Sequence, residues 1–598
     1  MGMIGVFRVP YYGDPNSKVV FVGEAPGAEE ERQLQPFVGE SGNKLTTVLG
    51  RHGWSRDEVY LTNLCMYRPE KNDFKNLIGS EQLKDGIRHL HEFLLSHRPN
   101  VVCALGNWPL YTLTGKHGKT PGSGIFNYRG SILNCHLSGL EGLKVIPTIH
   151  PAAILRDGSL YPLFDQDIAR VKADSAFPEL RLPERELNVV TDRDPEVLEL
   201  VVQKLLKAEK LAVDIETFKP HRLACVGFAD SPKTAYCIVW SENALIRDAI
   251  YRLLSSNIPK ITHFGSYDTE VLHLHGFPFN NWWWDTMVGQ HVMWPELPRA
   301  LKTLVSIYTR EPYYKNEAKE DSEDQKSWGP RVNKDRLWKY NCKDDACTFE
   351  VQEEQEKEMN EGPKAWRDFF NFEMEMMHVA SEIDRTGMLR DEERRKLLEK
   401  ALVMEWAERQ GALNEVAGFN INAGSHTQVK KLLYERLMLP PRYNKKNKLT
   451  SDVDALVSLI QFATDKMHIS VRESTRFEWG KKALAVKLVM LVRRTRKTLS
   501  SYILTRCSDD GRLRSLYKVP ATETGRWSAE KYVDGSGLNG QTIPRDDVEI
   551  PDELIKDSTS VVVPPEVLPS EDESDDEGEG DSDSDDGVLV STGPNNVE

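Results

Sequence analysis

Two separate blocks of the chain alternate short, apolar, β-rich runs with stretches of helical period. The first block contains "KVVFVG", "VVCALG" and "LKVIPTIH", with "LKDGIRHLHEFLLSH" among the helical stretches between them. The second block begins at "LAVDIET" and continues through "CVGFAD", "TAYCIVW" and "KITHFG" before it becomes helical. This alternation is typical of α/β domains, and in the first block it favours a largely parallel sheet. The sequence therefore predicts two α/β units.

The rest of the chain adds a helical segment and an acidic end. A length of 598 residues exceeds what one hydrophobic core supports, so we expect several domains. Proline and charge over 176–188 predict a linker between the two α/β units. Amphipathic helical patterns follow, and the last residues have little to bury. The expected segments are an α/β domain at 1–180, an α/β domain at 189–360, a mainly α-helical region at 365–550 and a disordered tail at 551–598.

The charge of the chain is unevenly distributed. The net charge is −15, but residues 571–586 hold eleven Asp or Glu and no Lys or Arg. Residues 481–497 hold seven cations and no acid. This basic stretch predicts contacts with phosphates, and a solvated helix face is the alternative. The acidic tail is either a solubilising end or a shield for the basic surface.

Composition also excludes several protein classes. No apolar run approaches the roughly 20 residues that cross a bilayer, so we expect no membrane segment. The start, "MGMIGVFRVPYYGDP", lacks the basic-then-apolar pattern of a secretory signal. The eight cysteines are scattered without a CxxC pair, which argues against a disulfide framework or a zinc ribbon. We expect an intracellular protein with reduced thiols.

The second α/β block contains acids whose spacing indicates a shared site. Asp214 and Glu216 lie two apart on a predicted strand and therefore point to the same face. Asp268 opens a helical stretch, and Tyr340 and Asp344 are four apart on one helical face. A lone D-x-E is most often a solvated strand edge, but four converging acids repel one another unless hard divalent cations bind them. Two such ions can activate water against a phosphodiester.

The order DxE, YD and YxxxD resembles the DEDDy class of 3′–5′ exonucleases, the ribonuclease H-like proofreading domain of family A DNA polymerases. The resemblance covers about residues 190–360. It implies that Tyr340 orients the attacking water. It also implies that two Mg²⁺ or Mn²⁺ ions are bound by Asp214, Glu216, Asp268 and Asp344.

Other residues of this block compete for a place in the site. Asp285 begins an Asp-Thr-Met that resembles a helix start in the family, so we expect it to cap backbone N–H groups rather than bind metal. Asp345 lies off the face shared by Tyr340 and Asp344. The run Trp282–Trp284 either stacks on bases or packs in the core.

The first block carries a second set of motifs. "VVFVGEAPGAEEERQLQPFVGESGNKL" leads from a strand into a glycine-containing loop, which suits a phosphate or an anionic transition state or is only a tight turn. "YLTNLCMYRP" and "IPTIHPAAILR" follow. GEAPG, PFVG, TN and HPAA in this order resemble the family 4 uracil-DNA glycosylases over about 18–175. Such enzymes extrude a base before cleaving its glycosidic bond.

This resemblance implies roles for four residues. Glu24 would position the water and Phe37 would stack on the flipped base, while Asn63 would read the edge of that base and His150 would stabilise its developing charge. The chain departs from the family in one respect, because the family carries four cysteines that bind an iron–sulfur cluster.

Residues 1–20 here contain no cysteine, and Tyr67 and Gly86 align with the later cysteine pair of the family. We therefore expect no iron–sulfur cluster. The domain either excises uracil or is a relic that guides a DNA strand.

The third segment resembles the thumb and first palm elements of family A polymerases. "FNINAGSHTQVKKLLYERLMLP" is similar to part of the helical thumb. "TETGRW" and "GSGLNGQTIPR" are similar to the TGR and G-x-N-L-Q-N-I-P elements, with Gly540 and Thr542 departing from the common residues. A generic helical bundle is the alternative. The DNA-binding residues implied are Arg493, Arg494, Arg496, Lys497, Arg526 and Gln541.

The remaining palm and fingers motifs of that family are missing from the sequence. There is no D-x-S-x-x-E-L-R, no R-x-x-x-K followed by Tyr-Gly, and no His-Asp-Glu. Without those aspartates two-metal nucleotidyl transfer has no site, so this chain alone should not polymerise DNA. We expect the palm and fingers to come from a second polypeptide or a downstream exon, or to be lost from an interrupted gene.

The combined hypothesis is the amino-terminal portion of a family A DNA polymerase resembling those of large tailed bacteriophages. Its partners would be DNA 3′ ends and primer-template, and it would work in the host cytoplasm if it is viral. The alternative is a non-enzymatic DNA-binding scaffold with two vestigial sites.

Overall fold

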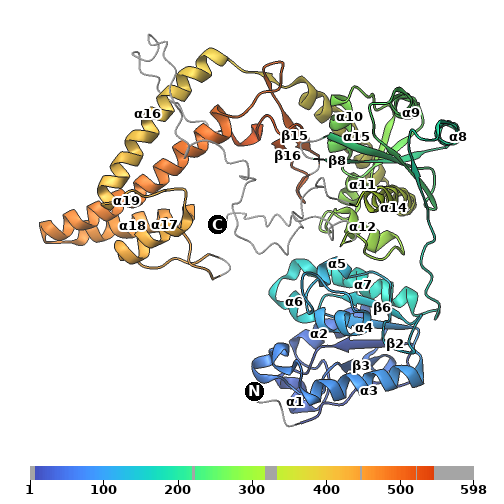
Figure 1. Cartoon of the computed structure of the whole chain (residues 1–598). Helices are drawn as coiled ribbons and strands as arrows, with labels where there is room; N and C mark the ends of the chain where they lie inside the picture. Colours follow the sequence, from blue (N-terminus) through green and yellow to red (C-terminus); the bar gives the residue numbers. More distant parts are fainter. Residues whose placement is uncertain (1–6, 219–221, 317–332, 445–446, 520, 544–598) are drawn as a thin grey trace. The chain divides into compact units, whose positions relative to one another are not determined.

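The computed structural model describes residues 7–218, 222–316, 333–444, 447–519 and 521–543 (Figure 1). The predicted acidic tail at 551–598 lies outside these residues. The described chain divides into two compact units. The first contains residues up to Ser381 together with Lys518–Ser528, and the second contains Glu382–Tyr517 together with the residues from Ala529.

The first unit begins with a six-stranded sheet in the order β1-β3-β2-β4-β6-β5. The four central strands are parallel, and the two short edge strands pair antiparallel. This confirms the largely parallel α/β sheet predicted from the first block. The strands are β1 (Tyr12–Gly13), β2 (Val19–Gly23), β3 (Tyr60–Asn63), β4 (Val101–Leu105), β5 (Leu133–Asn134) and β6 (Lys144–Thr148).

Helices cover both faces of this sheet, which is why its central strands β2 and β4 are apolar throughout. Phe21 of β2 packs in one core with Leu45, whereas its neighbour Val20 packs in another core with Leu90. Alternate residues of a strand point to opposite faces, so one apolar run supplies both cores. The helices of this module are α1 (Ala28–Gln33), α2 (Glu40–Arg51), α3 (Glu81–His97), α4 (Asn107–Thr114), α5 (Ile125–Tyr128), α6 (Pro151–Arg156) and α7 (Tyr161–Asp174).

The second sheet has the order β12-β11-β8-β9-β10-β7 and is mixed. Its central hairpin strands β8, β9 and β10 are antiparallel, while β7, β11 and β12 join as parallel strands. The strands are β7 (Glu186–Val190), β8 (Leu211–Phe218), β9 (Arg222–Ala229), β10 (Thr234–Val239), β11 (Lys260–Thr262) and β12 (Trp282–Asp285).

A long helix, α14 (Lys334–Glu361), contacts β8, β9 and β10 and so crosses the middle of the second sheet (Figure 1). This packing brings residues that are more than a hundred positions apart in the sequence onto one surface. The other helices of the module are α8 (Pro195–Leu205), α9 (Ala244–Ser255), α10 (Gly265–Leu274), α11 (Thr286–Met293) and α12 (Leu301–Tyr308).

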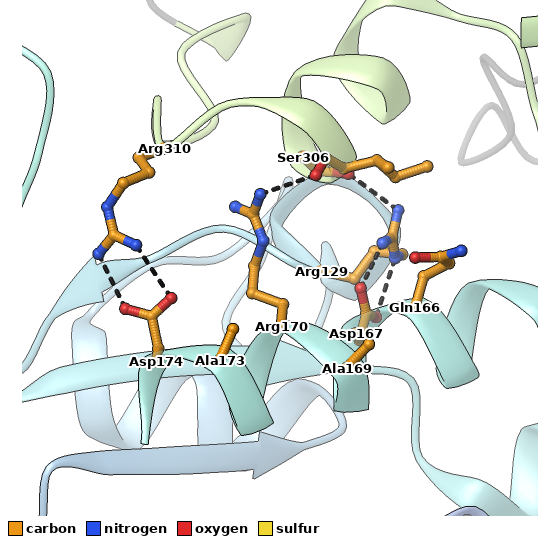
Figure 2. A pocket seen from close by; sticks show the side chains of 10 residues that line it. Arg129, Gln166, Asp167, Ala169, Arg170, Ala173, Asp174, Ser306 and Arg310 are labelled. Atoms are coloured by element: carbon orange, nitrogen blue, oxygen red, sulfur yellow. Dashed lines mark hydrogen bonds and ion pairs between the residues drawn. The ribbon is translucent and has the colours of Figure 1, made fainter. Parts of the chain in front are cut away.

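Arginines join the two α/β modules within the first unit (Figure 2). Arg129 forms a buried ion pair with Asp167 of α7 and donates to Ser306 of α12 at 3.1 Å. Arg310, which follows α12, binds both carboxylate oxygens of Asp174 at 2.8 and 3.0 Å. Paired charges that are removed from water hold their geometry well, because either partner left alone is strongly destabilising.

The second unit is mainly helical, as predicted. Its core includes Leu413, Leu433, Leu456 and Val489, which come from different helical segments. Its helices are α16 (Glu392–Ala417), α17 (His426–Lys430), α18 (Val453–Ile469) and α19 (Glu473–Thr498), and α15 (Lys364–Thr386) spans the division between the units. Its short strands are β13 (Met388–Leu389), β14 (Arg512–Leu513), β15 (Ser515–Lys518) and β16 (Ser528–Lys531). None of the described helices is long and apolar enough to cross a bilayer.

Candidate active sites

Three carboxylates of the second module converge at the centre of its sheet. Asp214 and Glu216 lie on β8, and Asp344 lies on α14, which crosses that strand. Each offers one oxygen atom, and these atoms all lie within 4.8 Å of one another. The two-residue spacing on the strand and the packing of α14 therefore produce the cluster that the sequence predicts.

Asp268 lies beside this cluster in the first turn of α10 and is only 5% exposed. Burial, followed by the charges of Asp214, Asp285 and Glu216, raises its pKa well above the usual value. Its Oδ2 has no hydrogen-bond partner among the described residues. A buried carboxylate oxygen without a donor is costly in the absence of a cation.

Burial and the charge of Asp344 raise the pKa of Asp214 to about 7, against the lowering effects of Lys315 and of a hydrogen bond from Asn341. Asn341 Nδ2 donates to Asp214 Oδ2 at 3.0 Å. The carboxylate is thus held in place but only partly ionised at neutral pH until a cation compensates its neighbours.

Tyr340 lies one helical turn before Asp344 on α14, as the YxxxD spacing predicts. Burial is the main reason that its pKa is raised well above the usual value, so the phenol stays protonated. Its hydroxyl oxygen accepts a hydrogen bond from Lys315 Nζ at 2.6 Å.

Two residues in contact with this cluster were not found from the sequence. Tyr314 donates its hydroxyl proton to Asp344 Oδ1, and Lys315 Nζ pairs with Asp344 Oδ2 at 2.5 Å. Both belong to the loop after α12, where "EPYYK" has no helical or strand spacing relative to the acids. Its aromatic pair followed by a cation was the only available signal.

Asp285 caps the start of α11, which confirms the prediction made for it. Its Oδ1 accepts from Met287 N at 2.9 Å, and its Oδ2 accepts from Gly265 N and Thr262 Oγ1, both at 2.8 Å. Gly265 begins α10, so the same carboxylate ties the helix that carries Asp268 to the next helix. Oxygens with this many donors are poor metal ligands.

Asp345 lies against β9 and is not one of the three acids whose oxygen atoms lie within 4.8 Å of one another. A Cβ atom on Gly227 would lie 1.7 Å from Asp345 Oδ2, so this carboxylate is pressed against the strand. Trp282 and Trp284 are buried, and Trp284 packs against Phe370 with ring centroids 4.2 Å apart. These two tryptophans therefore pack in the core rather than stack on bases.

The donor atoms of the acid cluster fit a hard divalent cation. They are carboxylate oxygens only, which Mg²⁺, Mn²⁺ and Ca²⁺ prefer, with no thiolate or imidazole in the group. The unpartnered Oδ2 of Asp268 and the raised pKa of Asp214 both indicate that the ionised form of these acids is incompletely compensated by the surrounding protein.

The candidate residues of the first module lie at the carboxyl ends of its parallel strands. Glu24 follows β2, Asn63 ends β3 and His150 follows β6. Gly106, after β4, has a φ of +100°, and a Cβ there would lie 2.9 Å from Glu24 Oε1 and 3.3 Å from His150 Cβ. Only glycine permits that backbone and that approach. Ligands of open α/β sheets bind at this edge.

Phe37 and Asn63 meet at Gly23. A Cβ on Gly23 would lie 2.4 Å from Asn63 Oδ1 and 2.7 Å from Phe37 Cζ. Phe37 itself has a φ of 56°, in the left-handed region that side chains rarely adopt, and Gly42 leaves room for its backbone. The four residues singled out from the sequence are therefore brought together.

His150 is a neutral hydrogen-bond donor in this site. Burial lowers its pKa to about 4. Its Nδ1 accepts from Ala152 N at 3.2 Å, so the proton of the neutral ring lies on Nε2. Burial raises the pKa of Glu24, whose Oε1 accepts a long hydrogen bond from Trp108 N at 3.4 Å.

Glu30 and Arg56 hold the two loops of this site, and sequence reasoning missed both. Glu30 accepts from Gly27 N and Gly39 N, each at 3.1 Å, and so ties the GEAPG loop to the PFVG loop. Arg56 donates to Phe37 O at 2.6 Å. Glu30 lies in "GAEEER", where it resembles a solvated acid.

The positions aligned with cluster cysteines are filled by packing. A Cβ on Gly86 would lie 2.2 Å from Leu64 O, so a side chain there would require the backbone to move. Tyr67 packs beside the core that contains Cys65. The absence of an iron–sulfur cluster stays a prediction.

The candidate DNA-binding residues occupy different environments. Arg494 and Lys497 are exposed on α19, whereas Arg493 donates to Ala423 O and Ser451 O, both at 2.6 Å, and so holds the helical bundle. Arg496 lies against Gly424.

Arg526 is exposed in a loop of the first unit, and Arg299 Nη2 binds that loop at Ala521 O at 2.8 Å. Gln541 is exposed in the second unit. A role of these residues in binding DNA stays a prediction.

Comparison with known proteins separates the same two modules. Residues 10–172 match the uracil DNA glycosylase superfamily, and residues 189–360 match a 3′–5′ exonuclease family. The type-4 uracil-DNA glycosylases of Archaeoglobus fulgidus and Thermotoga maritima are 32% and 35% identical over 166 and 168 residues. Each match covers 27% of this chain and 79% of the relative.

Two polymerases are also similar to the chain. A DNA polymerase of Bacillus phage SP01 is 25% identical over 157 residues, which are 26% of this chain and 16% of that polymerase. The solved POL domain of Pol1 from M. smegmatis, in complex with DNA primer-template and dNTP, is 17% identical with a TM-score of 0.41. That match covers 60% of this chain and 56% of the solved one.

The glycosylase relatives are matched over most of their length, and the exonuclease match contains the whole acid cluster. The chain therefore belongs to the type-4 uracil-DNA glycosylase family through its first module, and its second module matches a 3′–5′ exonuclease family.

Proposed function

We propose that the second module removes nucleotides from DNA 3′ ends with the help of Mg²⁺ or Mn²⁺. The observation that carries this proposal is the group of three carboxylate oxygens within 4.8 Å on β8 and α14, inside the exonuclease match. The proposed ligands are Asp214, Glu216, Asp268 and Asp344.

The ions would supply an activated water and stabilise the leaving oxygen of the phosphodiester. The protein's own residues hold and orient the parts. Asn341 fixes the rotamer of Asp214, and Tyr314 fixes one oxygen of Asp344. The protonated hydroxyl of Tyr340 orients the attacking water, because a protonated phenol both donates and accepts hydrogen bonds.

The test is digestion of single-stranded DNA labelled at its 5′ end, with Mg²⁺ and with EDTA. A ladder shortening from the 3′ end only with metal supports the proposal. Asp248→Asn is the control for substitutions of the four proposed ligands, because Asp248 is an exposed acid on α9 with a long contact to Arg252. Digestion by wild type in EDTA at the same rate would contradict metal dependence.

We propose uracil excision from DNA as the activity of the first module. Its support is the convergence of Glu24, Phe37, Asn63 and His150 at one sheet edge, with the proton of His150 on Nε2. Alkali cleavage of a uracil-containing oligonucleotide after incubation with the full chain measures it. If the oligonucleotide stays intact at high protein concentration, the result would favour the alternative that the first module is a relic that guides a DNA strand.

DNA is the substrate common to both matched families, and as part of a polymerase the chain would hold primer-template DNA. A fragment that carries a polymerase palm and fingers would complete the polymerase, in the host cytoplasm if the gene is viral. Primer extension by the chain alone, and mixed with such a fragment, tests this. Extension by the chain alone would overturn it.

A further inference from the structure

A lysine occupies the acid cluster of the exonuclease module. Lys315 Nζ lies 2.5 Å from Asp344 Oδ2 and 2.6 Å from Tyr340 Oη, and 4.5 Å from the centroid of the Tyr340 ring. Its side chain is only 18% exposed. The ammonium therefore contacts both a proposed metal ligand and the residue proposed to orient water.

The charge of Lys315 reaches beyond these two contacts. It lowers the pKa of Asp214 on β8 and, after burial, that of His263 before α10. Other nearby cations are directed elsewhere, because Lys343 and Arg185 both pair with Glu311. Lys315 is thus the cation that faces the cluster from the loop after α12.

The contacts of Lys315 and of a metal ion on Asp344 exclude each other. A divalent ion binds a carboxylate oxygen at roughly 2.0–2.6 Å, the range in which the ammonium already lies from Oδ2. Two cations at such distances repel each other strongly where water is scarce. Tyr314 keeps hold of Oδ1, so Asp344 need not move when the ammonium leaves.

We propose that Lys315 is a built-in, displaceable counter-ion that sets the metal affinity of the acid cluster. It compensates the carboxylates when no metal is bound, and metal must displace its ammonium from Asp344. The flexible four-carbon stem of lysine permits this movement without a change of backbone. This inference rests on the proposed function only in that the cluster binds a divalent ion.

As a counter-ion, Lys315 weakens metal binding to the cluster and stabilises the metal-free protein. Removing its charge should therefore tighten Mn²⁺ binding about tenfold, because the ion no longer competes with an ammonium at Oδ2. The same change should lower the melting temperature of the metal-free protein, because the carboxylates then repel one another without compensation.

The experiment measures Mn²⁺ binding to the full chain by calorimetry and thermal unfolding with and without Mn²⁺. Lys315→Met removes the charge at similar length, and Lys315→Arg retains it. Lys343→Met is the matched control, since Lys343 Nζ lies 4.9 Å from the Tyr314 ring centroid but pairs with Glu311.

We expect tighter Mn²⁺ binding and a lower metal-free melting temperature for Lys315→Met only, with saturating Mn²⁺ removing the difference in melting temperature. Unchanged or weaker Mn²⁺ binding by Lys315→Met, with normal binding by wild type, would overturn the counter-ion role and leave the exonuclease proposal standing. Absence of Mn²⁺ binding by wild type would overturn both.

Discussion

The two α/β modules of the first unit place their candidate sites differently, at strand ends in the first and at the centre of the sheet in the second, and the electrostatics of the two sites also differ. The glycosylase-like site gathers a neutral histidine, an amide, a phenyl ring and one buried carboxyl group at strand ends. The exonuclease site gathers carboxylates within 4.8 Å of one another and one lysine. The first arrangement contains a single carboxyl group, whereas the second concentrates several carboxylates that one lysine compensates only in part.

This difference indicates how each site does chemistry. His150 presents an N–H and no charge, so in the proposed uracil excision it would act on the substrate by hydrogen bonding. The charge of Asp344 disfavours ionisation of Asp214, so in the proposed exonuclease a bound divalent ion would compensate both acids and supply the chemistry. Changes at one site should leave the other unaffected, and the predictions below test this separation in order of decreasing effect.

Asp214→Ala should reduce 3′–5′ digestion about a thousandfold, because loss of a shared ligand removes several kcal/mol of transition-state stabilisation. Uracil excision by the same protein should be unchanged. Both rates are measured on one preparation with two oligonucleotides. Equal loss of both activities would indicate a folding defect, and wild-type digestion would refute the site.

His150→Ala should lower uracil excision about a hundredfold, the effect of removing one preorganised donor to a developing negative charge. Metal-dependent digestion should continue at the wild-type rate. Single-turnover excision assays give the change in the chemical step. A loss smaller than about threefold would remove His150 from the proposed mechanism.

Tyr340→Phe should slow digestion about tenfold, because the variant keeps the ring packing and loses only one hydrogen-bonding hydroxyl. Mn²⁺ affinity should not weaken, since the carboxylates are intact. The measurement pairs a digestion rate with a calorimetric titration. A loss as large as that of Asp214→Ala would instead make Tyr340 essential for the placement of the ions.

The pH dependence of stability should reveal buried neutral histidine in the first module. His150 has a folded-state pKa of about 4, below its ordinary value of 6.5, so the unfolded chain binds more protons between these pH values. Stability should therefore fall by about 1.4 kcal/mol per pH unit for this group as the pH drops through that window. His150→Gln should reduce the slope.

Urea unfolding at several pH values between 6.5 and 4 measures this slope. Burial lowers the pKa values of His263 and His291 to about 3 and about 4, so these two residues still contribute part of the slope in His150→Gln. His89→Gln is the control for loss of a histidine at an exposed position, because the His89 side chain is 40% exposed. An unchanged slope in His150→Gln would contradict the buried, neutral state of His150.

Local spacing explains which features could be predicted from the sequence. Asp214 and Glu216 share a strand face, and Tyr340 and Asp344 share a helix face, because backbone periodicity alone decides these relations. The cap formed by Asp285 is also local, since its acceptors bind N–H groups two and three residues ahead. The apolar runs of the first sheet predicted strands for the same reason.

The residues that the sequence did not reveal act through contacts between distant segments. Glu30 accepts from Gly39, nine residues ahead, and so joins two loops, and Arg56 reaches back nineteen residues to Phe37. Lys315 contacts Asp344 twenty-nine residues away, from a loop without regular spacing. Arg493 shows the converse, because a cation in a basic stretch is used for internal hydrogen bonds.

The sequence by itself determined the order of the modules, the parallel sheet of the first and the acids and histidine available to each site. Periodicity and motif order are properties of neighbouring residues, so they can be recognised without knowledge of the packing. Tertiary structure alone decided which charges are compensated and by which partner. Burial and long-range contact set the protonation of His150, the raised pKa of Asp214 and the place of Lys315, because desolvation and Coulomb energy depend on distances that sequence spacing does not contain.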